Sequence, residues 1–246
     1  MQLIVLAAGY ATRLYPLTRD TPKPLLPVAS RPMIEHVLDA AAPIIGIDHA
    51  IVATNDRFAS QFNSWADSIQ APFPISILND GTTSNDDRLG AIGNLRKVLM
   101  DHAIDDDVIV IAGDNLFTEP LDGFGKFCGG KSTPCLGVYD VGSIEEATKY
   151  GVVAIDENAS ITSFEEKPAE PKSTLIGIAL YWYPRSVLPE IDRYLAEGNN
   201  PDQPGRLIQW LYPQVTVHAW PVPGQWLDIG SHETLAEAQE IIGDRV

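Results

Sequence analysis

The sequence predicts an α/β fold with one mixed, mainly parallel central sheet. Short apolar runs alternate with amphipathic stretches through the first half of the 246 residues, and this alternation is typical of βαβ units. In the second half, extended segments follow one another with only short helical pieces between them, which indicates antiparallel additions to the sheet. Because neither a repeat nor a long linker divides the chain, we expect a single domain over 1–246, with a βα half over about 1–130 and a mixed half over about 131–246.

The first half contains four apolar runs that we interpret as strands and three amphipathic stretches that we interpret as helices. The strands are expected at 3–7, 50–54, 75–78 and 108–112, and the helices at 33–42, 58–69 and 89–100. In the first helix, steps of three or four residues place four apolar side chains on one face, namely Ile34, Val37, Leu38 and Ala41. In the second half, strands are expected at 134–141, 151–155, 161–164, 175–183 and 215–220, and helices at 187–196 and 231–242.

The charge balance excludes several kinds of partner. The chain has 17 Lys and Arg against 33 Asp and Glu, which gives a formal net charge of −16. Proteins that bind nucleic acids or anionic membranes use clustered cations, whereas the dense charge run here is Asp105-Asp106-Asp107, so we expect neither partner. There is no basic leader segment and no apolar stretch near the ~20 residues of a membrane span, so we expect a soluble, cytoplasmic protein. Cys128 and Cys135 are too few for a disulfide framework and lack zinc-site spacing.

The stretch after the first predicted strand combines small residues with two cations. It lies at the carboxyl end of that strand, where α/β sheets bind ligands, and backbone N–H groups around Gly9 can approach phosphate oxygens. Arg13 offers a bidentate fork and Lys23 a point charge; the alternative is an ordinary loop with two solvated cations. Both the dinucleotide fingerprint and the P-loop pattern are absent. We expect Pro22 and Pro24 to hold the chain extended around Lys23.

Two acidic residues stand where a hard cation could be held. Asp114 follows the strand predicted at 108–112, and a carboxylate there is either a metal ligand or part of a strand-terminating Asx turn. Asp228 precedes the closing helix, and because Ser231 can cap that helix, Asp228 is free for another role. From the residues alone, both interpretations of Asp114 stay open.

Several motifs occur in an order that resembles one known family. They are Ala8-Gly9-x-Ala11-Thr12-Arg13-Leu14 with Pro16, Thr18 and Pro22-Lys23-Pro24-Leu25, then Gly113-Asp114-Asn115, Tyr150-Gly151-Val152-Val153, Phe164-Glu165-Glu166-Lys167-Pro168 and Gln225-Trp226-Leu227-Asp228-Ile229-Gly230. They resemble the signature of the sugar-1-phosphate nucleotidyltransferases, also called nucleoside-diphosphate-sugar pyrophosphorylases, and among them the glucose-1-phosphate thymidylyltransferases. The resemblance covers nearly the whole chain. It implies a Rossmann-like three-layer α/β/α fold, with a nucleotide-binding first half and a sugar-phosphate-binding second half.

The resemblance also implies an activity and the residues that carry it. A nucleoside triphosphate and a sugar 1-phosphate are joined to give a nucleoside-diphosphate sugar and pyrophosphate, with Mg²⁺ as the cofactor. The implied catalytic residues are Arg13 and Lys23, and the implied magnesium ligands are Asp114 and Asp228. The implied nucleotide-binding residues are Ala7, Ala8, Gly9, Thr12, Gly90 and Asp114, and the implied substrate-binding residues are Gly151, Glu166 and Lys167. Without the resemblance, Glu166 and Lys167 would be interpreted as a solvated strand end.

The sequence departs from the family's pattern in the nucleotide-binding half. Ala8 and Ala11 stand where many members have glycine, which narrows the conformations open to the loop. The stretch 88–93 lacks the glutamine with which thymidylyltransferases read a pyrimidine, so the base is left open, as are the sugar, the pathway and the oligomeric state, for which a homo-oligomer is one option. The alternatives are a cytidylyltransferase for phosphocholine or a phosphonate, a non-catalytic nucleotide-sugar-binding protein, and a metal-dependent glycosyltransferase. The last lacks support, because no D-x-D pair follows the strand at 108–112.

Three expectations concern the rest of the second half and the charge of the site. Most of its aromatic residues are expected in the core, and one or two of them are candidates for lining a sugar or choline-like pocket; they are Tyr181, Trp182, Tyr183, Trp210, Trp220 and Trp226. The turn-rich stretch 199–205 is expected to be a loop, and no C-terminal β-helix domain is expected, since the chain ends soon after the closing helix. Arg13, Lys23 and Lys167 are expected to form a positive pocket in an acidic protein.

Overall fold

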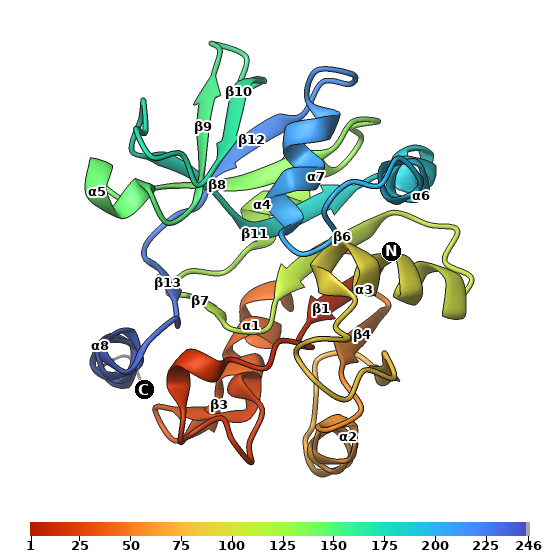
Figure 1. Cartoon of the computed structure of the whole chain (residues 1–246), viewed down its shortest axis with the longest axis vertical. Helices are drawn as coiled ribbons and strands as arrows, with labels where there is room; N and C mark the ends of the chain where they lie inside the picture. The colour runs from red at the N-terminus through yellow and green to blue at the C-terminus, as the bar shows by residue number, and fades with distance from the viewer. Residues whose placement is uncertain (245–246) are drawn as a thin grey trace.

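The computed structural model of the chain describes residues 1–244, and its main feature is a mixed sheet that has nine strands within those residues (Figure 1). Four neighbouring strands run parallel and come in the spatial order β6 (Val108–Ala112), β1 (Gln2–Leu6), β4 (His49–Thr54) and β5 (Ile75–Asn79). These are the four strands predicted from the apolar runs of the first half. The predicted parallel part of the sheet is therefore confirmed.

Five strands of the second half extend this sheet in mixed directions. The long strand β11 (Leu175–Tyr183) runs antiparallel to β6, to β8 (Cys135–Asp140) and to β9 (Gly151–Ile155). The strand β10 (Ile161–Glu166) is antiparallel to β9, and β12 (His218–Pro221) is parallel to β8. The antiparallel additions predicted from the extended segments are confirmed.

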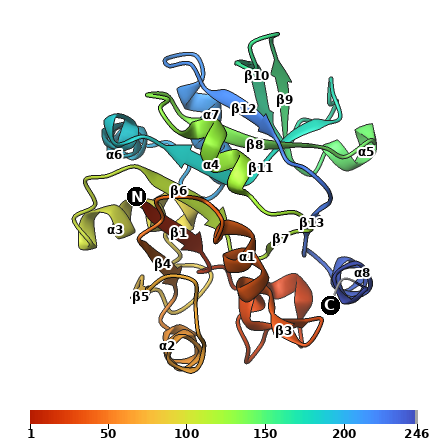
Figure 2. The same ribbon diagram turned by 180° about the vertical axis from the view of Figure 1, so that it is seen from behind.

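Helices cover both faces of the sheet and produce three layers (Figures 1 and 2). Apolar side chains of α1 (Met33–Ala41), α2 (Ala59–Ser68) and α4 (Asp122–Cys128) form one core cluster with Leu3 and Val5 of β1. Those of α3 (Gly90–Asp101), α6 (Leu188–Ala196) and α7 (Pro204–Leu211) form a second cluster with Ile4 of β1. Successive side chains of a strand point to opposite faces, so β1 contributes to both cores. The Rossmann-like α/β/α layering is thereby confirmed.

Several short elements were not predicted. Two strands of three residues, β7 (Asn115–Phe117) and β13 (Trp226–Asp228), pair antiparallel outside the main sheet. A hairpin of β2 (Pro27–Val28) and β3 (Arg31–Pro32) contacts the closing helix α8 (His232–Gly243). The remaining pieces are α5 (Ile144–Ala147) and the 3₁₀ turns η1 (Thr12–Leu14), η2 (Lys23–Leu25) and η3 (Arg185–Val187). Segments this short show no hydrophobic period, which is why the sequence did not reveal them.

The extended chain predicted around Lys23 is wrong. Lys23 is the first residue of the 3₁₀ turn η2, in which Leu25 N–H bonds to Pro22 C=O at 2.9 Å and Leu26 N–H bonds to Lys23 C=O at 3.0 Å. A residue before proline usually avoids helical angles, but the two turn hydrogen bonds offset this preference. Pro24 is compatible with the turn because its fixed φ is close to helical. The turn buries Lys23, whose exposed fraction is 8%.

The stretch 199–205 is a loop only in part, because α7 begins within it at Pro204. Proline is favoured at the first position of a helix, where its missing N–H needs no partner.

No helix among residues 1–244 is both long and apolar enough to cross a lipid bilayer. Cys128 and Cys135 are both buried and unbridged.

Candidate active site

The loop after β1 is held in one conformation by three hydrogen bonds. Ala11 adopts left-handed angles (φ 46°, ψ 44°), and its carbonyl accepts from Thr18 Oγ1 at 2.7 Å and from Leu14 N–H at 3.0 Å. Asn55 Nδ2, at the end of β4, donates to the carbonyl of Ala8 at 3.0 Å. Left-handed angles are costly for a residue with a Cβ, so Ala11 takes the conformation that glycine would supply without strain.

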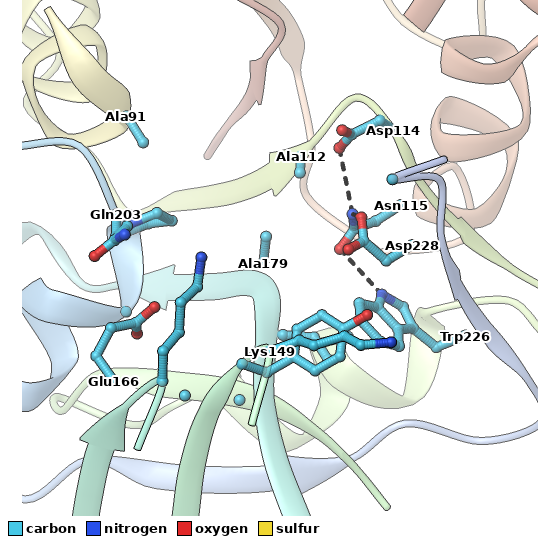
Figure 3. A pocket seen from close by; sticks show the side chains of 18 of the residues that line it. Ala91, Ala112, Asp114, Asn115, Lys149, Glu166, Ala179, Gln203, Trp226 and Asp228 are labelled. Atoms are coloured by element: carbon cyan, nitrogen blue, oxygen red, sulfur yellow. Dashed lines mark hydrogen bonds between the residues drawn. The ribbon is translucent and has the colours of Figure 1, made fainter. Parts of the chain in front are cut away.

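Asp114 and Asp228 meet because the short strands β7 and β13 pair. The register places Asp228 opposite Asn115, the residue after Asp114. Asn115 Nδ2 lies 3.3 Å from Asp114 Oδ1 and 3.4 Å from Asp228 Oδ1, and Asn115 Oδ1 accepts from Trp226 Nε1 at 3.0 Å (Figure 3). Asn115 is only 4% exposed. One buried amide, to which no role was assigned from the sequence, thus orients both carboxylates.

The two acids lie close enough for their charges to interact. Burial raises the pKa of Asp228 above its ordinary value of 3.8 and the charge of Asp114 raises it further, whereas Lys23 and Arg13 lower it. Lys23 Nζ lies 2.5 Å from Asp114 Oδ2. No group of three or more His, Cys, Asp or Glu within 1–244 forms a metal site. Two carboxylates are nevertheless what Mg²⁺ usually takes from a protein, since water and substrate phosphates complete its shell.

A cavity of about 660 Å³ opens beside the two acids and is lined by residues from both halves of the chain (Figure 3). Its lining includes Arg13, Asp114 and Asp228 together with three residues predicted to bind substrate, which are Gly151, Glu166 and Lys167. Tyr181 and Trp226 were expected to be core residues. Both are buried, and both contribute to this wall.

Glu166 and Lys167 are held by the backbone around them. Gly151 and Gly205 have no room for a Cβ, because one there would meet the side chains of Phe164 and Glu166. Burial raises the pKa of Glu166, and the charges of Lys167 and Arg206 oppose this rise. Lys167 has a left-handed φ of 48°, and its N–H bonds to Tyr150 C=O at 3.0 Å. Both residues lie on the cavity wall, Glu166 half-buried and Lys167 exposed.

A second cavity of about 290 Å³ adjoins the first and shares Leu6, Ala91 and Asp114 with it. The predicted nucleotide-binding residues Ala8, Gly9 and Gly90 line it. Other residues of its wall were not predicted, namely Tyr10, Asn85, Arg88, Asn94 and Asp202. Asp202 belongs to the stretch 199–205, whose turn residues gave no sign of this contact.

Two of the predicted nucleotide-binding residues line neither cavity. Ala7 is buried and its N–H bonds to Ala53 C=O at 2.9 Å, while Thr12 is exposed in the turn η1. Lys23 also lies outside the cavity walls but reaches the site through its ion pair with Asp114. The structure thus brings together the predicted acids, cations and substrate-binding residues around two joined cavities.

Sequence comparisons find relatives that match this chain over most of its length. The chain is 25% identical to the bifunctional protein GlmU of Methanocaldococcus jannaschii over 100% of this chain, and 29% identical to UTP–glucose-1-phosphate uridylyltransferase of Synechocystis sp. over 94% of it. It is 30% identical to the mannose-1-phosphate guanylyltransferase catalytic subunit beta of Drosophila melanogaster over 92% of it. The chain spans only 55%, 60% and 58% of the length of these relatives.

Solved structures share the fold. A UDP-glucose pyrophosphorylase complexed with UDP-glucose superposes with a TM-score of 0.82 at 20% identity, covering 100% of this chain and 99% of that one. A UDP-glucose pyrophosphorylase from Acinetobacter baumanii superposes with a TM-score of 0.81 at 21% identity, covering 99% and 93%. The family model described as nucleotidyl transferase matches residues 2–245. The chain therefore belongs to the nucleotidyl transferase family.

Proposed function

We propose that the protein is a Mg²⁺-dependent nucleotidyltransferase that joins a nucleoside triphosphate to a sugar 1-phosphate and releases pyrophosphate. The observation that carries this proposal is the meeting of Asp114, Asp228 and Lys23 where two cavities join. The smaller cavity, beside the loop of Ala8 and Gly9, takes the nucleotide, and the larger cavity takes the sugar phosphate. The names of the relatives, which include uridylyl and guanylyl transferases acting on sugar 1-phosphates, support the same class of reaction.

The reaction needs alignment and charge neutralisation more than acid–base chemistry. An oxygen of the sugar phosphate attacks the α-phosphorus, a new P–O bond forms, and the bond from the α-phosphorus to the oxygen bridging to the β-phosphate breaks. Pyrophosphate leaves with that electron pair. The attacking oxygen is already anionic, so neither a general base nor a covalent intermediate is required.

Each cation of the site has a place in this scheme. Arg13 binds the triphosphate and the leaving pyrophosphate through its planar fork. Lys23 is buried and fixed by Asp114, so its ammonium group can meet the charge that develops on the reacting phosphates without reorganising. Lys167 binds the phosphate of the acceptor.

The uncharged and acidic residues of the site position the substrates. Glu166 accepts a hydrogen bond from a sugar hydroxyl, and Gly151 allows the sugar to approach the backbone. The nucleotide is held by the loop residues Ala8 and Gly9 and by Gly90 at the start of α3, which line the smaller cavity.

Asp114 and Asp228 are the proposed ligands of Mg²⁺. The fit rests on their hard oxygen atoms, on the amide of Asn115 that orients both, and on the proximity by which the charge of Asp114 raises the pKa of Asp228. When bound, Mg²⁺ neutralises phosphate charge and makes the α-phosphorus easier to attack.

Three broader features belong to the same proposal. The chain forms one domain, because strand β1 contributes side chains to both core clusters, one on each face of a continuous sheet. A cytoplasmic location follows from the substrates, since nucleoside triphosphates are cytoplasmic metabolites. A homo-oligomer is one option for the assembly in solution, and light scattering on the purified protein tests it.

The test is a pyrophosphate-release assay over a matrix of nucleoside triphosphates and acceptors, with Mg²⁺ or with EDTA. We expect release with at least one sugar 1-phosphate, loss of release in EDTA, and a decrease in kcat by orders of magnitude for Asp228→Asn and Lys23→Ala. The exposed residues Asp67 and Lys172 supply the matched controls Asp67→Asn and Lys172→Ala, which should keep full activity.

Other outcomes would point elsewhere. Release with phosphocholine or a phosphonate alone would replace the acceptor class, and nucleotide-sugar binding without release would favour a non-catalytic protein. Full activity of Asp228→Asn would contradict the assignment of the acids.

A further inference from the structure

An unpaired acceptor atom is buried in the wall of the smaller cavity. Asn94, one turn into α3, is 4% exposed and lines this cavity. Its Nδ2 donates to Gly90 C=O at 3.1 Å, whereas its Oδ1 has no hydrogen-bond partner. A carbonyl only accepts, so the bond to Gly90 decides which way the amide points. The atom that remains free is therefore the oxygen.

Several donors on the same wall already have partners within the protein, whereas the buried hydroxyl of Tyr10 has none among residues 1–244. Arg88 donates through Nε and Nη2 to the carboxylate of Asp202, at 2.9 and 2.8 Å, and through Nη1 to Asn85 C=O at 2.6 Å. The first N–H groups of α3 are also used, because Ile92 N–H bonds to Pro201 C=O at 2.9 Å and Ala91 N–H lies 3.4 Å from Asp202 C=O. A helix start normally offers free donors, but here the stretch 199–205 takes them.

The wall is also rigid. Gly90 has a φ of +77°, and a Cβ on it would lie 2.5 Å from Pro201 C=O, so the start of α3 cannot shift toward or away from the stretch 199–205 without breaking these contacts. Asn94 is one turn further along the same helix. Its oxygen thus has a fixed position in a wall that also carries the Asp202 carboxylate, an acceptor, and the Tyr10 hydroxyl, which can donate or accept.

We infer that Asn94 selects the nucleobase, and that its Oδ1 accepts a hydrogen bond from the exocyclic amino group of cytosine, adenine or guanine. This inference rests on the proposed function, which puts the nucleotide in the smaller cavity. An amino group projects from the ring and carries two N–H bonds. The N3–H of uracil or thymine is recessed between two carbonyl oxygens and reaches a fixed acceptor less readily.

The test compares nucleotides that differ in one exocyclic amino group, which is replaced by an oxo group or by hydrogen. CTP is compared with UTP, and ATP and GTP are each compared with inosine triphosphate, in pyrophosphate release and in calorimetric binding. Leaving a buried acceptor unpaired is costly, so the wild-type protein should prefer the amino member of the pair that it accepts by at least about tenfold in kcat/KM, which corresponds to about 1.4 kcal/mol.

Two variants separate recognition from folding. Asn94→Leu has a similar shape but no acceptor, so the ratio between the paired nucleotides should fall to about one. Asn63→Leu is the control, because exposed Asn63 also donates its amide to the carbonyl four residues earlier, that of Ala59, but lies on α2 outside both cavities. It should keep the wild-type ratio.

Each outcome decides one point. A preference for UTP, or an unchanged ratio in folded Asn94→Leu, overturns the inference. If Asn94→Leu does not fold, the wild-type comparison still decides. Release of pyrophosphate with UTP preferred keeps the proposed function and rejects the role of Asn94. Tighter binding of CTP than of UTP without any release of pyrophosphate supports the role of Asn94 and rejects the proposed function. Equal binding within every pair rejects the role of Asn94 whether or not pyrophosphate is released.

Discussion

Asn115 is the residue on which the geometry of the two acids depends, and Asn115→Leu tests this. The substitution keeps the shape of the side chain but removes the contacts of Nδ2 with Asp114 and Asp228 and the bond that Oδ1 accepts from Trp226. Trp226 is 8% exposed, so its indole N–H would be left without a partner in the protein interior. An unpaired buried donor costs about 1–3 kcal/mol.

This cost has two measurable consequences. For a domain of this size, each kcal/mol lowers Tm by about 2–4 °C, so Asn115→Leu should melt several degrees below the wild type. Substituting a residue that orients metal ligands typically weakens metal affinity by about 10- to 100-fold. The Mg²⁺ concentration that gives half-maximal pyrophosphate release should therefore increase by about that factor.

The control is Trp226→Phe, which removes the indole N–H and so leaves Asn115 Oδ1 unpaired. It keeps the contacts of Asn115 Nδ2 with both carboxylates. It should lower Tm by a similar amount and move the Mg²⁺ half-saturation much less. If the two variants shift the Mg²⁺ requirement equally, Asn115 has a structural role only. An unchanged Mg²⁺ requirement in Asn115→Leu would refute the orienting role outright.

Two further substitutions test how local strain and burial act in the site. Ala11→Gly should raise the free energy of unfolding by up to about 1 kcal/mol, because Ala11 has left-handed angles, whereas Ala40→Gly within the helix α1 should lower it by about 1 kcal/mol or more. Chemical denaturation measures both, and a loss in Ala11→Gly equal to that in Ala40→Gly would contradict the strain. Burial raises the pKa of Glu166 above its ordinary value of 4.5, so its contribution to stability is fully present below about pH 4.5 and is lost as pH rises through the raised value. Glu166→Gln should therefore increase Tm at pH 7, with the difference from the wild type vanishing below about pH 4.5, and an equal or lower Tm at pH 7 would show that burial of the Glu166 carboxylate does not destabilise the fold.

The sequence predicted five of the longer helices but missed α4, the amphipathic helix α7 and the shortest strands. The apolar stripe of Ile34, Val37, Leu38 and Ala41 indicated α1, and all four side chains are buried. The strands β7 and β13 have three residues each, too few for any alternation to show. Yet their pairing is what places Asp228 beside Asp114. The motifs indicated that both acids matter, while the contact between them depends on pairing across 113 residues.

The walls of the site were predicted only where a motif carries them. Gly151, Glu166 and Lys167 belong to motifs that resemble the family, and all three line the larger cavity. Asp202 belongs to no motif, because its role depends on Arg88, which lies 114 residues away. The turn residues around it indicate a loop but give no sign of what the loop contacts.

The charge of the larger cavity differs from the positive pocket expected from the sequence. Its lining, within the described residues, has three cations, Arg13, Lys149 and Lys167, and four acids, Asp114, Glu146, Glu166 and Asp228. Lys149 is paired with Glu146 at 2.7 Å, and Lys23 is paired with Asp114 at 2.5 Å, so much of the positive charge is already balanced. In a chain of net charge −16, such a cavity does not by itself attract a polyanion. On the proposed function, a divalent cation held by Asp114 and Asp228 would supply the missing positive charge, which gives the two acids an electrostatic role as well as a coordinating one.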